Sequence, residues 1–224
     1  MVHIRELNDF CIKTVYAALT KETLPERAWI LVEGAQDRCE ALHQHGVQRS
    51  TDLFKLVDEG RVDDLVRTTG IEKAYVIRLY NVLMFHRFKP TLLTKLEVPR
   101  REHAESVRDA GIKNTGKLLL ECETPEGTLD LARRASIPED DLYRILTMAD
   151  LMRKAAVKAT KTRLFMAAGI RSLRMLGAQS PVEFRNTLRD IIADTGIVKA
   201  VPTPKEVASD IAWAKLHPVV VAGL

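Results

Sequence analysis

The residues with the clearest potential for chemistry are six cationic side chains in one short stretch. Positions 154–182 contain no aspartate or glutamate and include Lys154, Lys158, Lys161, Arg163, Arg171 and Arg174. Residues 154–224 carry 11 basic and 5 acidic residues, whereas residues 1–153 carry 23 and 25. Clustered lysine and arginine attract polyanions and neutralise backbone phosphates. The stretch therefore predicts a basic surface, although an ordinary solvated helix face has the same composition.

Motifs for catalysis or for a cofactor are absent from the sequence. It contains no P-loop, no G-x-S-x-G, no H-E-x-x-H and no paired-glycine dinucleotide fingerprint. The acidic pairs Asp63-Asp64 and Asp140-Asp141 fit helix starts, where negative charge complements the helix dipole. We therefore expect a non-catalytic protein without a cofactor.

The cysteines and the hydropathy of the sequence indicate the environment in which the chain works. The three cysteines, Cys11, Cys39 and Cys122, are an odd and scattered number, which favours a reducing, cytoplasmic setting over a disulfide framework. Cys39 and His43 have the spacing to share a helical face, but His45 falls elsewhere and no fourth ligand is near, so we expect no metal site. No apolar run approaches the roughly 20 residues that span a bilayer, and we expect no membrane partner.

Helix signals dominate the sequence. The capping motif S/T-x-x-E, which satisfies backbone N–H groups at a helix start, occurs at Thr23/Glu26, Thr69/Glu72, Ser136/Glu139, Ser180/Glu183 and Thr203/Glu206. Apolar residues recur with helical spacing, as at Phe184, Leu188 and Ile192. Alternating strand patterns with Asn-Gly or Asp-Gly turns are absent. The sequence thus predicts an all-α fold.

A pattern of glycines indicates an internal repeat. Each copy has an apolar residue four positions before a glycine, an apolar residue directly after it and a leucine seven positions after it. The copies read Leu42…Gly46-Val47…Leu53, Val107…Gly111-Ile112…Leu118 and Phe165…Gly169-Ile170…Leu176. In this pattern the glycine supplies the left-handed residue that ends one helix and turns the chain into the next.

A second motif follows each copy after 24, 25 and 27 residues. It reads Thr69-Gly70-Ile71, Ala135-Ser136-Ile137 and Thr195-Gly196-Ile197. Two motifs in the same order, three times, predict three tandem repeats in a compact or solenoid-like array after an N-terminal helix. The predicted divisions are an N-terminal helical cap at 1–31, repeats at 32–94, 95–153 and 154–217, and a tail at 218–224.

This pattern resembles the helix-hairpin-helix superfamily. The stretches Met148-Ala149-Asp150-Leu151-Met152-Arg153 and Ala167-Ala168-Gly169-Ile170-Arg171-Ser172-Leu173 resemble, more narrowly, a bacterial family catalogued only as a domain of unknown function and built from tandem helix-hairpin-helix units. The resemblance covers roughly residues 30–215. It implies an α-helical fold, and no activity is established for the family.

The sequence departs from DNA-binding members of the superfamily at the hairpin. Those members have two glycines, thirteen and eleven residues before the Gly-Ile pair, whose backbone N–H groups contact a phosphate. Here the positions hold Glu33 and Ala35, Val98 and Arg100, and Ala156 and Lys158. Copy one is therefore expected to be structural. Copies two and three gain cations instead, and Arg100 and Arg101 join the six cations of copy three as candidate nucleic-acid-binding residues.

Two functions remain open. The first is sequence-nonspecific binding of duplex DNA through phosphates, because nothing marks a recognition helix. The second is a scaffold or adaptor, because stacked repeats present extended surfaces. Aromatic residues between 75 and 88 offer a partner patch, although their spacing favours core packing. Trp29 and Trp213 are also expected in the core, and the oligomeric state is not indicated.

Overall fold

The computed structural model describes residues 7–98 and 100–224, without the side chain of Arg27. Residues 1–6 of the predicted N-terminal cap lie outside this part. Within it the chain forms α-helices, two short 3-10 helices and no strand, so the all-α prediction is confirmed. The elements are α1 (Ile12–Leu19), η2 (Glu26–Leu31), α2 (Ala35–Gln44), α3 (Ser50–Asp58), α4 (Val62–Thr69), α5 (Lys73–His86), η3 (Leu93–Lys95), α6 (Arg101–Asp109), α7 (Thr115–Glu121), α8 (Pro125–Ala135), α9 (Glu139–Leu151), α10 (Ala159–Ala167), α11 (Leu173–Gly177), α12 (Pro181–Thr195) and α13 (Pro204–Leu216).

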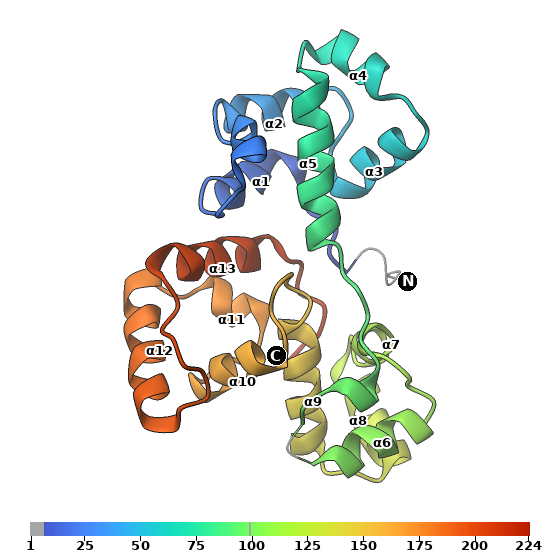
Figure 1. Ribbon diagram of the computed structural model, residues 1–224. Coiled ribbons are helices and arrows are strands. Elements are labelled where there is room, and N and C mark those ends of the chain that lie inside the picture. Colours follow the sequence, from blue (N-terminus) through green and yellow to red (C-terminus); the bar gives the residue numbers. More distant parts are fainter. Residues whose placement is uncertain (1–6, 99) are drawn as a thin grey trace.

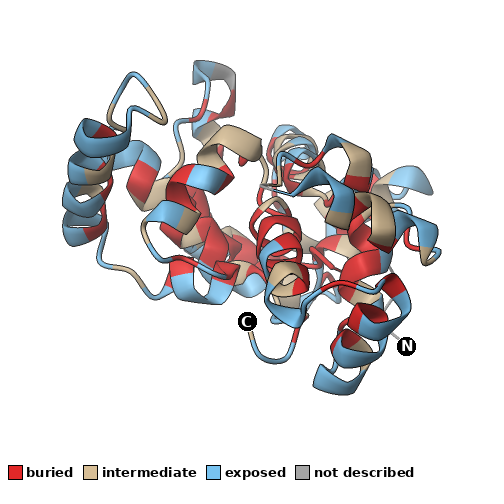
Figure 2. Ribbon diagram, turned by 90° about the horizontal axis from the view of Figure 1, so that it is seen from below, coloured by how far each residue is buried: buried red, intermediate tan, exposed pale blue. Residues whose placement is uncertain are grey.

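Apart from α1, which packs against α2, the described α-helices group into three sets of four (Figure 1). We call α2–α5 the first set, α6–α9 the second set and α10–α13 the third set. Each set has a hydrophobic core of its own, and Figure 2 shows that the buried residues follow the inward faces of the helices. The cores are also linked by residues that pack across sets, since Trp213 of α13 belongs to the core of the first set. Leu7 and Val221 belong to the core of the second set.

The same turn ends the first helix of every set. Gly46, Gly111 and Gly169 have φ angles of 88°, 99° and 78°, in the left-handed region. The next residue donates its backbone N–H to the carbonyl oxygen five positions earlier, over 3.0, 3.3 and 3.0 Å respectively. This is the bonding of a Schellman motif, which satisfies carbonyls at a helix C-terminus. The apolar residues four before and seven after each glycine are buried, as predicted.

The capping predictions had mixed outcomes. Thr203 and Glu206 form the expected reciprocal capping box at the start of α13. Ser180 precedes α12, but its side chain makes no capping hydrogen bond. The other three predictions were wrong, since no α-helix begins at Thr23, Thr69 or Ser136. Thr69 ends α4 and donates its hydroxyl to the Leu65 carbonyl, while Ser136 ends α8.

Ser136 occupies a position where glycine is favoured. It ends α8 with φ 54°, whereas the corresponding ends of α4 and α12 use Gly70 and Gly196, with φ 70° and 63°. A left-handed conformation costs a non-glycine residue about 1–2 kcal/mol, and part of this is offset by the higher chain entropy of unfolded glycine.

We therefore expect Ser136→Gly to raise the free energy of unfolding by about 0.5–1 kcal/mol. Urea denaturation measures this change. The reverse substitution Gly70→Ser is the matched control, and it should lower the free energy of unfolding by a similar amount. Ser136 is exposed and its side chain makes no capping bond. A loss of stability in Ser136→Gly would therefore contradict the strain argument.

The N-terminal segment differs from its prediction. The helix begins only at Ile12, and residues 7–10 form an irregular segment between the three sets. Leu7, Asn8 and Phe10 are all buried there. Leu7 therefore joins a different core from Val15 and Ala18 of α1.

Candidate functional site

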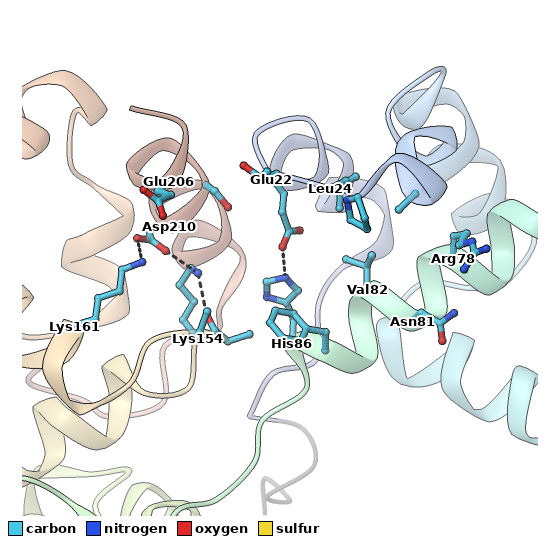
Figure 3. Close-up of a pocket in the computed structure, with 17 residues that line it drawn as sticks. Glu22, Leu24, Arg78, Asn81, Val82, His86, Lys154, Lys161, Glu206 and Asp210 are labelled. Carbon is cyan, nitrogen blue, oxygen red and sulfur yellow. Dashed lines mark hydrogen bonds and ion pairs between the residues drawn. The ribbon is translucent and has the colours of Figure 1, made fainter. Parts of the chain in front are cut away.

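Two of the predicted cations are held by one carboxylate. Lys154 Nζ lies 2.8 Å from Asp210 Oδ1, and Lys161 Nζ lies 2.5 Å from Asp210 Oδ2 (Figure 3). Lys154 is 4% exposed, so the expectation that it lies on a basic surface is wrong. Burial of an ammonium requires such a partner, because an unpaired charge in a protein interior is strongly disfavoured. Lys161 remains partly exposed, with 27% of its side chain accessible.

Three further candidates form ion pairs at the surface. Arg163 lies 3.4 Å from Glu97, Arg100 lies 3.2 Å from Asp141, and Arg101 lies 3.3 Å from Glu105. More than half of each arginine side chain is exposed, and pairs of this kind contribute only about 0–1 kcal/mol. These arginines are therefore accessible, but their charge is partly compensated.

The remaining three candidates are exposed and form no ion pair with another described residue. Lys158 precedes α10, Arg171 lies in the turn before α11, and Arg174 is the second residue of α11. Because α10 has nine residues at 1.5 Å each, it separates Lys158 from the two arginines by about 14 Å. The acid-free stretch thus presents cations at two ends of one helix rather than as a continuous patch.

The hairpin before α10 has an unusual backbone. Ala156 has φ 64°, which is left-handed and rare for a residue with a Cβ. The position therefore has the left-handed conformation that favours glycine, although it holds an alanine. Sequence alone gave no sign of this, because an alanine does not indicate a positive φ.

A cleft of about 770 Å³ separates the first set from the third. Its first wall includes Arg78, Val82 and Phe85 of α5, and the opposite wall includes Lys161 of α10 and Asp210 of α13 (Figure 3). Phe85 is 54% exposed.

Trp29, expected in the core, is instead 61% exposed, because η2 turns its ring outward while Ala28 and Leu31 point inward.

A buried histidine closes the inner end of this cleft. His86 stacks on Trp213 with ring centroids 3.5 Å apart, and its Nε2 lies 3.2 Å from Glu22 Oε1. The other oxygen of Glu22 accepts a hydrogen bond from Trp213 Nε1 over 3.1 Å. Burial lowers the pKa of His86, and the interaction with Glu22 opposes this effect only in part. His86 is therefore neutral near pH 7 and acts as a packing and hydrogen-bonding group.

A second polar cluster joins all three sets. Asn8 Nδ2 donates to the carbonyl oxygens of His86 and Arg153 over 2.8 and 2.7 Å. The buried guanidinium of Arg153 lies 2.6 Å from Asp150 Oδ1, and it also donates to the carbonyls of Leu7 and Pro218. Sequence reasoning missed this cluster, although Asp150 and Arg153 stand three positions apart in an otherwise apolar helix end.

Three of the residues considered for catalysis or metal binding have local partners. Asp63 pairs with Lys73 at 2.7 Å, and Asp64 pairs with Arg67 at 2.6 Å. Cys39 is buried 3.8 Å from the hydroxyl of Tyr75. Within residues 7–98 and 100–224, no group of three or more histidine, cysteine or acidic side chains is arranged to hold a metal ion.

Comparison with known proteins gives a family. The sequence model described as "Domain of unknown function (DUF4332)" matches residues 99–217, more than half of the 224-residue chain. The chain belongs to the DUF4332 family. The match spans the second and third helical sets, so the cleft is formed between DUF4332 residues and a first set outside the match. No curated protein and no solved structure matches the chain. Among the described helices of this DUF4332 protein, none is long and apolar enough to cross a membrane.

Proposed function

We propose that this protein is a non-catalytic, sequence-nonspecific binder of duplex DNA, and that the third helical set makes the contact. The observation that carries the proposal is a set of exposed cations that form no ion pair with a described residue, Lys158, Arg171 and Arg174. They lie in a stretch of 29 residues without an acid, in the part of the chain that carries the whole excess of positive charge. Such side chains neutralise phosphates without reading the bases.

The helical sets fit this proposal as three helix-hairpin-helix-like repeats, at 32–94, 95–153 and 154–217. The equivalent turns at Gly46, Gly111 and Gly169 support a common origin. Within the third repeat, the glycine-like backbone of Ala156 supports a hairpin of the DNA-binding type. Residues 155 and 156 line the cleft, however, so the contact is assigned to Lys158 rather than to hairpin N–H groups. The free thiols of Cys11, Cys39 and Cys122 support a reducing, cytoplasmic setting.

Fluorescence anisotropy of a labelled duplex, titrated at several salt concentrations, tests the proposal. Three phosphate contacts predict a slope of about −2.7 for log K against log salt, at about −0.9 per contact. The combined variant Lys158→Glu, Arg171→Glu, Arg174→Glu is expected to abolish binding at low salt.

Lys199→Glu is the matched control. Lys199 is an exposed lysine of the same repeat, away from the three cations in sequence and without an ion pair to a described residue. An equal loss of binding in this variant would assign the affinity to net charge and not to the proposed residues. Absence of wild-type binding at low salt would overturn the proposal.

The second candidate is a scaffold or adaptor. It is favoured by the cleft between the first and third repeats, whose rim carries the half-exposed ring of Phe85. Exposed aromatic side chains beside a concave surface are common in protein interfaces. This alternative is favoured if the protein binds no duplex at low salt and if substitutions of cleft residues weaken the binding of a protein partner.

A further inference from the structure

A second cavity lies between the second and third helical sets. It measures about 560 Å³, and one wall is a single face of α9, where Asp140, Tyr143, Arg144 and Thr147 recur with helical spacing. Met166 and Ile170, from α10 and the turn after it, form the opposite wall together with Arg171. Gly223 and Leu224 also line it. The cavity is of the size that usually holds a small organic ligand, and it is far too small for a duplex.

Two arginines, Arg144 and Arg171, supply the positive charge of this cavity. Arg171 forms no ion pair with a described residue. Arg144 lies 3.6 Å from Asp141 Oδ1, a long contact, and the other oxygen of Asp141 is within 3.2 Å of both Arg100 and His103. The carboxylate of Asp141 therefore faces the guanidinium groups of both Arg100 and Arg144. Among the side chains of the lining, Asp140 carries the one negative charge against the two guanidinium groups of Arg144 and Arg171.

The uncharged lining fits the rest of a nucleotide. The aromatic ring of Tyr143 offers a surface for stacking a base, and Met166 and Ile170 offer apolar contact on the opposite side. The hydroxyls of Tyr143 and Thr147 can donate hydrogen bonds to a sugar or a phosphate. Arginine is the side chain best suited to the phosphate itself, because its fork of N–H groups binds oxyanions in a bidentate manner.

We propose that this cavity binds a single nucleotide, with its phosphate between Arg144 and Arg171 and its base beside Tyr143. The two arginines come from different helical sets, so the ligand bridges the second set and the third. This goes beyond the proposed duplex contact. It uses Arg144, which has no part in that contact, and it leaves out Lys158 and Arg174.

Isothermal titration calorimetry of the full chain with adenosine 5′-monophosphate tests the site. Adenosine and inorganic phosphate are titrated in parallel to separate the base from the anion. We expect the nucleotide to bind more tightly than either part. Arg144→Gln and Arg171→Gln should each weaken binding by about 10- to 100-fold, since each removes a charge-assisted hydrogen bond to phosphate. Both side chains are largely exposed, and circular dichroism at increasing temperature checks that the variants stay folded.

Arg174→Gln is the matched control, because Arg174 is exposed nearby but does not line the cavity. It should weaken duplex binding and leave nucleotide binding unchanged, whereas Arg144→Gln should do the reverse. No heat of binding with millimolar nucleotide would overturn the site while leaving the duplex proposal intact. Inorganic phosphate binding as tightly as the nucleotide, or unchanged affinity in Arg144→Gln and Arg171→Gln, would also overturn it.

Discussion

Replacing Asp210 by asparagine is expected to lower the free energy of unfolding by about 3–5 kcal/mol. The carboxylate is 4% exposed and neutralises two ammonium groups, Lys154 at 2.8 Å and Lys161 at 2.5 Å. Asparagine keeps the shape of the side chain but removes its charge. Lys154, which is buried as deeply as Asp210, is then left without a counter-ion. Removing one member of a buried ion pair is costly because the other charge stays in a poorly solvated place.

Urea denaturation at pH 7 measures this loss. Asp190→Asn is the matched control, because Asp190 also pairs with a cation, Arg189, but is two-thirds exposed. The control should change the free energy of unfolding by less than about 1 kcal/mol. If the two variants lose the same stability, then Lys154 finds water or another partner and the interior position of this ion pair carries no special cost.

The burial of Lys154 shows where sequence reasoning reached its limit. The six cations of positions 154–174 were correctly seen to lack acidic neighbours in the sequence. The counter-ion of Lys154 and Lys161 is Asp210, which is more than 45 positions away and comes close only when α13 packs into the third set. Spacing along the chain contains no information about that distance. Lys158, Arg171 and Arg174 keep their predicted exposure because no acidic side chain among residues 7–98 and 100–224 pairs with them.

Local signals were read more reliably than distant ones. The turn at Gly169 was predicted because a left-handed helix end is set by a few consecutive residues, and glycine is the residue that tolerates it. Ser136 was misread as a helix start because serine also favours that role, and its left-handed conformation is rare. Trp29 was placed in the core on hydrophobicity alone, although its orientation depends on how η2 packs. The hydrogen bonds of Asn8 join segments up to 145 positions apart, and no local sequence pattern indicated them.

Arg153→Met is expected to destabilise the protein as strongly as Asp210→Asn, by about 3–5 kcal/mol. Methionine has a similar length and packs well in an interior, so the volume lost is small. The substitution removes the partner of the Asp150 carboxylate, which is itself 4% exposed. It also removes hydrogen bonds to the carbonyls of Leu7 and Pro218, through which the two chain ends are held against the second set.

A double-mutant cycle with Asp150→Asn separates the ion pair from these other bonds. If the pair dominates, the double variant should be more stable than the sum of the single losses by about 1–3 kcal/mol, since neither charge is then stranded. Asp150 also accepts the backbone N–H of Leu173 over 2.7 Å, a bond that the asparagine oxygen can retain. Strict additivity would mean that the carbonyls of the chain ends, and not Asp150, are what Arg153 stabilises. In that case Arg153→Met should increase proteolysis near residues 7 and 218 before it unfolds the helical sets, because those segments lose their anchor first.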